Sequence, residues 1–130
     1  MNLDQSQILD DLAQLFRDAV LSHINDIAID KGLGPPEFYY VSVKDKKINE
    51  VGTRLDKEIE IKLSISGSAA EYGIITPLYL YITNQIGVEK WNDDVMRVIN
   101  EMMIKMDINY NIQIKTHIDP FLFDMYLYAK

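Results

Sequence analysis

The amino-acid sequence predicts an α+β fold in which two helices pack on one face of a four- to five-stranded, mostly antiparallel sheet. Two segments place apolar residues at three- and four-residue steps, which is the spacing of amphipathic helices. Other segments alternate apolar and polar residues, which is typical of strands with one buried face. The connections between segments are short and favour antiparallel pairing. We therefore expect residues 1–130 to form a single domain.

The first helix is predicted around the apolar stripe that runs from Ile8 to Ile27, and Gly32, Gly34 and the Pro35-Pro36 pair end it. The second helix is predicted over Val88 to Met106. Its apolar stripe is Trp91, Val95, Val98, Ile99, Met102 and Met106.

Strands are expected over five segments that are β-branched, aromatic or alternating. They are Phe38–Val43, Lys57–Ile65, Ile74–Thr83, Tyr110–Ile118 and Phe121–Tyr128. We expect the second and third to pair as a hairpin, with Pro77 at a strand start, an edge or a bulge. In the last strand, Phe121, Phe123, Met125 and Leu127 are predicted to face inward. The segment from Lys44 to Lys57 is charged and lacks apolar periodicity, so we expect an exposed loop or loose hairpin there.

Composition excludes several functional classes. The net charge is −7, which argues against a protein that binds the phosphate backbone or a specific sequence of nucleic acid. There is no cysteine, so disulfides, thiolate zinc sites and a cysteine nucleophile are excluded. The sequence between Met1 and Asp11 is acidic and is not expected to be a signal peptide. No uncharged run is long enough to predict a membrane-spanning helix.

No pattern in the chain predicts a catalytic, cofactor-binding or metal-binding residue. The two histidines, His23 and His117, lie far apart in the sequence, and we expect His23 to be a hydrogen-bonded residue at the core boundary. Neighbouring carboxylates at Asp10/Asp11, Glu58/Glu60 and Asp93/Asp94 are typical of solvated faces and helix starts. Phosphate-binding glycine loops and nucleophile-elbow motifs are absent from the sequence.

Tyrosine distribution is the feature that points to a function. Tyr79 and Tyr81 are predicted to lie opposite the aliphatic side of one strand, and Tyr126 and Tyr128 opposite that of another. If the helices cover the aliphatic face, these four rings lie on the uncovered face. Two interpretations remain open, which are a solvated sheet with ordinary β-propensity and a surface that meets another protein chain. Stacking on single-stranded nucleic acid is disfavoured by the negative charge.

Charge is distributed unevenly along the chain. Residues 1–37 carry a net charge of −5, whereas residues 38–62 carry +1. An acidic first helix beside a basic segment that holds Lys46, Lys47 and Arg54 would suit head-to-tail contact between identical subunits. A solvated helix and a mobile loop explain the same pattern equally well.

The layout resembles that of the tail-terminator and head-to-tail completion (neck) proteins of long-tailed bacteriophages. The features that carry the resemblance are the amphipathic opening helix (Ile8 to Ile27), the charged segment before the strand KEIEIKLSIS, the helix KWNDDVMRVINEMM and the terminal strand FLFDMYLY. The resemblance implies a structural virion protein that is assembled in the host cytoplasm. Such a protein forms a ring, commonly of six copies, which caps the tail tube and contacts tail-tube and head-connector proteins. It implies no catalysis, no cofactor and no membrane.

Two other classes remain as alternatives. One is a small acidic inhibitor or immunity-type protein that masks a basic surface of its target. The other is a hydrolase or nuclease that uses carboxylates with a divalent metal ion.

Overall fold

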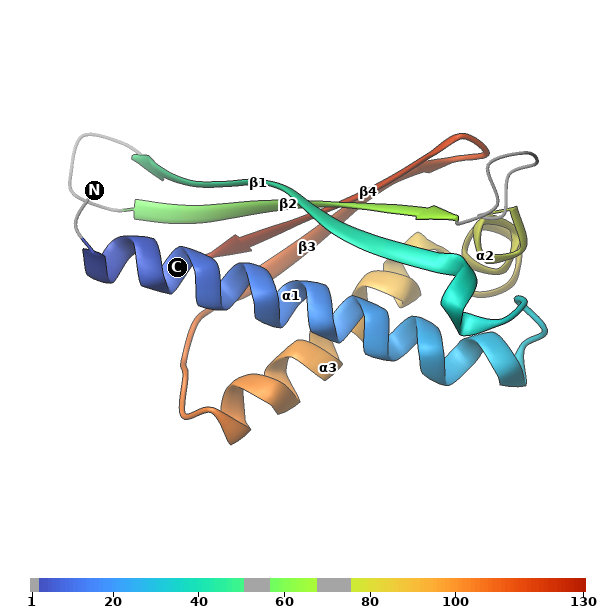
Figure 1. Ribbon diagram of the computed structural model, residues 1–130, viewed down its shortest axis with the longest axis horizontal. Helices are drawn as coiled ribbons and strands as arrows, with labels where there is room; N and C mark the ends of the chain where they lie inside the picture. The colour runs from blue at the N-terminus through green and yellow to red at the C-terminus, as the bar shows by residue number, and fades with distance from the viewer. Residues whose placement is uncertain (1–2, 51–56, 68–75) are drawn as a thin grey trace.

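The computed structural model describes residues 3–50, 57–67 and 76–130, and it has the predicted α+β class. The helices are α1 (Leu3–Asp30), a single 3-10 turn η1 (Pro36–Phe38), α2 (Thr76–Leu80), the π-helical turn η2 (Tyr81–Ile86) and α3 (Val88–Lys105). The strands are β1 (Tyr39–Glu50), β2 (Lys57–Gly67), β3 (Ile112–Asp119) and β4 (Leu122–Ala129). Figure 1 shows α1 and α3 together on one side of the sheet.

The four strands form one antiparallel sheet in the order β1-β2-β4-β3. The two hairpins β1–β2 and β3–β4 meet along the central pair β2–β4, where Ile61 is opposite Leu127 and Leu63 is opposite Met125. The helix α1 contacts β1 and β2, whereas α3 contacts β3 and α1. Each helix therefore covers one hairpin, and together they bury one face of the sheet.

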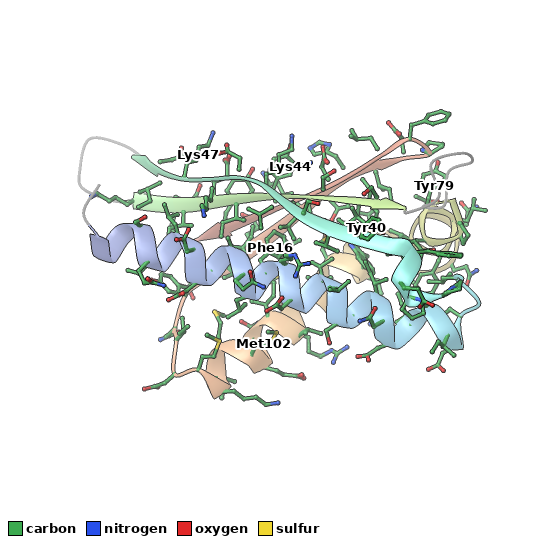
Figure 2. All side chains as sticks on the ribbon, viewed as in Figure 1. Phe16, Tyr40, Lys44, Lys47, Tyr79 and Met102 are labelled. Carbon is green, nitrogen blue, oxygen red and sulfur yellow. The ribbon has the colours of Figure 1, made fainter. Side chains whose placement is uncertain are left out.

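The core lies between the helical layer and the inner face of the sheet. The strict alternation of β2 directs four apolar side chains inward, and α3 presents residues at three- and four-residue steps toward them. Figure 2 shows Phe16 of α1 between the helix and the sheet. Fully buried side chains of this core include Phe16, Ile24, Ile61, Leu63, Trp91, Val95, Ile99, Met125 and Leu127.

The predicted helix stripes are largely confirmed, with three changes. Ile8, the first residue of the predicted stripe on α1, is exposed. On α3, Met103 is buried, whereas Met106 is half exposed, because α3 ends at Lys105 and the chain turns at Asp107 in a left-handed conformation (φ 55°). His23 of α1 was predicted to be a hydrogen-bonded residue at the core boundary, but it is buried, and its Nε2 has no hydrogen-bond partner among the described residues.

The prediction of a strand over Ile74–Thr83 is wrong for its described residues, because residues 76–86 form the helical turns α2 and η2, and residues 74–75 lie outside the described part of the chain. Pro77 lies in the first turn of α2, where its missing N–H costs nothing. Leu78, Tyr81 and Ile82 are buried at helical spacing, whereas Leu80 is exposed. Gly87 (φ 86°) ends η2, and its N–H donates to the carbonyl of Ile82 at 2.8 Å. The hairpin predicted between this segment and β2 therefore does not exist.

Of the two alternatives predicted for Lys44–Lys57, an exposed loop or a loose hairpin, the described residues show the hairpin, because residues 45–50 pair with β2. Residues 44–50 continue β1, and residues 51–56 lie outside the described part of the chain. A bulge between Val43 and Asp45 adds one residue to β1, so that the inward side chains change from odd to even positions. Lys46 then points toward α1 and pairs with Asp10. The bulge and this inward lysine remove the apolar periodicity.

A charge in the core tests the two-layer packing. Val95 is fully buried, and Val95→Asp would place a carboxylate among apolar side chains, which costs several kcal/mol. We expect the variant to lose cooperative unfolding in circular dichroism. Asn100→Asp adds the same charge on the exposed side of α3 and should unfold like the wild type. A folded Val95→Asp protein would contradict the assignment of this face to the core.

The buried imidazole of His23 makes stability depend on pH. Its ring centroid lies 5.2 Å from that of Trp91. Burial lowers the pKa of His23; Asp94 and Asp26 oppose that shift, whereas Arg97 and Lys90 reinforce it. The unfolded chain therefore binds the proton more readily than the native chain.

We expect the contribution of His23 to stability to be constant above the ordinary histidine pKa of about 6.5 and to fall as the pH drops below it. Urea unfolding midpoints measured across this window test the prediction. His23→Phe should flatten the dependence, whereas His117→Asn, which alters an exposed histidine, should preserve it. An unchanged slope in His23→Phe would contradict this role of His23.

Candidate functional site

The sheet face that α1 and α3 leave uncovered is the candidate functional site, and we call it the open face. Figure 2 shows Lys44 and Lys47 on the side of the sheet away from the helices. Pairing of the strands places side chains in cross-strand rows on this face. Three such rows are Lys47–Glu60–Tyr128–Gln113, Asp45–Lys62–Tyr126–Lys115 and Ser42–Ser64–Asp124–His117.

The two tyrosines of β4 occupy the middle of the open face and are half-buried by their neighbours. The Nζ atom of Lys62 lies 5.7 Å from the ring centroid of Tyr126, and that of Lys115 lies 5.4 Å from that of Tyr128. Such cation–π contacts hold the rings against the sheet. Burial, followed by the nearby carboxylate of Glu60, raises the pKa of the Tyr128 hydroxyl, so this group is neutral at physiological pH.

Ion pairs surround these rings with charges of both signs. The Nζ atom of Lys47 lies 3.3 Å from Oε2 of Glu60, and the Nζ atom of Lys62 lies 3.8 Å from Oδ2 of Asp124. Asp124 is the most buried acid of this face, with 7% of its surface exposed. The result is a surface with an amphipathic aromatic centre and a polar surround, which is the composition of many protein–protein contacts.

The residues predicted to form the interface lie in different parts of the structure. Tyr126, Tyr128 and Lys47 lie together on the open face. Tyr79 lies on α2 beside the end of the sheet (Figure 2), and Tyr81 is buried in η2, because the segment that holds them is helical.

The basic residues of the prediction are divided as well. Lys46 points to the helical side and is paired with Asp10, so at least one contact between the acidic helix and the basic segment forms within one chain. Arg54 lies outside the described residues.

The structure also shows exposed apolar residues that the sequence analysis missed. Tyr40 on β1 and Leu122 on β4 are about half exposed, and Phe121 is 93% exposed. Phe121 was expected to face inward. Instead it lies in the β3–β4 turn, because the carboxylate of Asp119 accepts hydrogen bonds from the N–H groups of Phe121 and Leu122, both at 2.7 Å. The Asp-Pro pair predicted the turn, and this use of the Asp side chain extends the turn through Phe121.

One row of the open face contains the residue types of a catalytic triad but not their order. Ser64, Asp124 and His117 form one row, but the carboxylate lies between the hydroxyl and the imidazole. A nucleophilic triad needs the imidazole in the middle. Ser64 and His117 are two strands apart, which is roughly 10 Å. This row therefore does not form a nucleophile–base pair.

Other sites for small ligands are weak. In the described ranges 3–50, 57–67 and 76–130, no three His, Asp or Glu side chains come together as a metal site. A hollow of about 460 Å³ lies between the start of α1 and the α3–β3 connection, with Asp11, Asp107 and Lys130 among its polar groups. Among the helices that the structure describes, none has the length and apolar character required to cross a membrane.

Comparison of the chain with protein-family models, curated proteins and solved structures gives no match. The site is therefore interpreted from its own geometry.

The pair between Lys62 and Asp124 provides a test of the electrostatics of the open face. Lys62→Met leaves a largely buried carboxylate without its nearest cation, and we expect a loss of about 1 kcal/mol in the free energy of unfolding. Adding Asp124→Asn to this variant should restore most of the loss, as a double-mutant cycle from urea unfolding would show. Additive effects of the two changes would contradict the coupling.

Proposed function

We propose that the protein is a non-enzymatic structural subunit that assembles with other polypeptide chains through the open face of its sheet. The observation that carries this proposal is the aromatic centre of that face, where Tyr126 and Tyr128 lie among charged side chains and no helix covers them. Tyrosine supplies a large apolar contact together with a polar hydroxyl, and it loses little conformational entropy on binding.

The particular assembly that we propose is the ring at the head–tail junction of a long-tailed bacteriophage. In this role several copies, commonly six, close the end of the tail tube and join it to the head connector in the virion. The support is the resemblance of the chain layout: an amphipathic first helix, a strongly alternating strand, a second helix and a terminal apolar strand. The helical α2–η2 segment departs from the expected layout, whereas the acidic charge suits a channel that does not retain DNA.

The alternative of a small acidic protein that masks a basic target is favoured by one observation. Four exposed carboxylates lie along α1, at Asp10, Asp11, Asp26 and Asp30. The arginine of that helix, Arg17, donates hydrogen bonds to Asp18 and to the carbonyl of Val41 in β1. Such a protein would stay monomeric and would bind poly-lysine in a salt-sensitive way. Asp11→Lys and Asp26→Lys would weaken that binding.

Assembly is tested by light scattering and negative-stain electron microscopy of the purified chain, alone and mixed with tail-tube and head-connector proteins. We expect rings, and we expect Tyr126→Asp to abolish them because a carboxylate at the centre of the contact loses its hydration. The monomer should remain folded, since Tyr126 is only half-buried. Tyr79→Asp is the matched control, because Tyr79 lies off the open face. A monomer under all conditions, or rings that tolerate Tyr126→Asp, would contradict the proposal.

A further inference from the structure

The two edge strands of the sheet differ in their availability for pairing. The β1 edge is interrupted by the bulge at Val43/Asp45, and Nε of Arg17 donates to the carbonyl of Val41 at 2.9 Å. The same strand carries Lys44, Lys46 and Lys47. Bulges, lysines and covering side chains are devices that prevent edge pairing. In contrast, β3 keeps an unbroken register with β4 over Ile112–Asp119 and contains no proline.

The free backbone groups of β3 follow from its pairing with β4. Asn111 and Lys130 exchange both backbone hydrogen bonds, at 3.1 and 3.0 Å. In an antiparallel pair, hydrogen-bonded positions alternate along the strand, so the odd-numbered residues of β3 bond to β4. The N–H and C=O groups of Ile112, Ile114, Thr116 and Ile118 therefore point away from the sheet. They form a template for one more antiparallel strand.

Opposite ends of this same edge carry an exposed ring and a hollow. Phe121, with 93% of its surface exposed, lies in the turn that follows β3. A hollow of about 200 Å³ lies on the open face at the start of β3, and its walls include Asn111, Gln113 and Tyr128. A surface with a protruding group at one end and a hollow at the other is complementary to itself under a two-fold rotation.

We propose that a second copy of this chain pairs antiparallel with β3, about a two-fold axis at Thr116, and that the two sheets become one sheet of eight strands. In this register Ile114 is opposite Ile118 of the second copy, and Thr116 is opposite Thr116 of the second copy. Three hydrogen-bonded pairs supply about six backbone hydrogen bonds. The turn that holds Phe121 comes opposite Asn111, beside the hollow.

Apolar pairing, backbone hydrogen bonds and side-chain parity favour this register over its neighbours. Lys115 is opposite His117 of the second copy and diagonal to both Asp119 and Lys115 of that copy, so charge contributes little to the choice. A shift of the second copy by two residues in one direction would place Lys115 directly against Lys115 of the second copy, which is unfavourable. A shift in the other direction would place Lys115 opposite Asp119, a gain that is small for an exposed pair. It would also lose the Ile114–Ile118 pairs and bring Pro120, which has no N–H, opposite Ile114. A shift by one residue would turn the inward-facing side chains of the second copy outward.

The dimer brings the two open faces to the same side of the extended sheet, with all helices on the other side. A two-fold contact closes on itself and is not the contact of a cyclic ring, so this inference does not depend on the proposed function. It gives each chain one defined neighbour through a surface separate from Tyr126.

A single introduced cysteine tests the register, because the natural chain has none. The Cα atoms of Thr116 and Thr116 of the second copy would be about 5.5 Å apart, which suits a disulfide. Those of Gln113 and Gln113 of the second copy would be roughly 20 Å apart. We expect Thr116→Cys to form a covalent dimer on mild oxidation and Gln113→Cys, on the same strand, to form none. Equal cross-linking of both variants would overturn the register.

The mass of the wild-type chain in solution tests the dimer itself. Sedimentation should give twice 15.0 kDa at high concentration, with hydrogen exchange slowed at the amides of Ile114, Thr116 and Ile118. Phe121→Ser should weaken the dimer at least about tenfold, since an apolar ring is removed from each end of the contact. Ile29→Ser, which alters an apolar residue that is 75% exposed at the end of α1, should have no effect.

Two outcomes would overturn the edge dimer. The first is a chain that is monomeric at every concentration and whose β3 amides exchange hydrogen at the same rate at every concentration. The second is a dimer or larger assembly whose affinity is unchanged by Phe121→Ser. Rings that are lost in Tyr126→Asp, formed from a chain whose β3 amides show no protection that depends on concentration, would support the proposed function and contradict this inference. A dimer weakened by Phe121→Ser without any ring would do the reverse, so the two proposals fail separately.

Discussion

Burial of the aliphatic face of the sheet beneath α1 and α3 is the constraint on which the rest of the structure depends. The sheet is only four strands wide, and its central pair β2–β4 supplies much of the inner face. Because both long helices are on one side, no described helix covers the other side. Its side chains contact one another through ion pairs and ring contacts, and the same groups can contact a partner. The aromatic face is thus left uncovered by α1 and α3 because both of these helices pack on the opposite side of the sheet.

The parts of the fold that follow from sequence are those in which one periodicity holds without exception. In β2 each inward position is aliphatic and each outward position is polar, and α3 has four buried residues at helical steps. The segment after residue 75 was misassigned because Leu78 and Ile82 fit both periods. Residues four apart share a face in a strand and nearly share one in a helix. The exposed Leu80 separates the two cases, and its exposure is a property of the folded chain.

The candidate site was predictable to the same extent. Tyr126 and Tyr128 alternate with buried residues of β4, so their side of the sheet follows from the pattern. Tyr79 and Tyr81 do not lie on the predicted face of the sheet, because their segment is helical. The difference between the two edges of the sheet could not be predicted from the sequence. The strand order places β3 at one edge and β1 at the other, and Arg17 contacts β1 across a separation of 24 residues. Local sequence patterns do not encode which strands become neighbours.

The bulge in β1 changes which side chains of the strand face the helices. Before it, odd-numbered side chains face the helices, and after it, even-numbered ones do. If the strand kept every residue but paired without the bulge, the alternation would be simple, and Lys46 and Lys47 would exchange sides of the sheet. The ammonium group of Lys47 would then lie on the side of α1, and the carboxylate of Asp10 would lose its partner Lys46. The bulge therefore determines which charges pair within the molecule and which face outward, so a change in strand pairing alone would alter the surface chemistry of this strand without altering its composition.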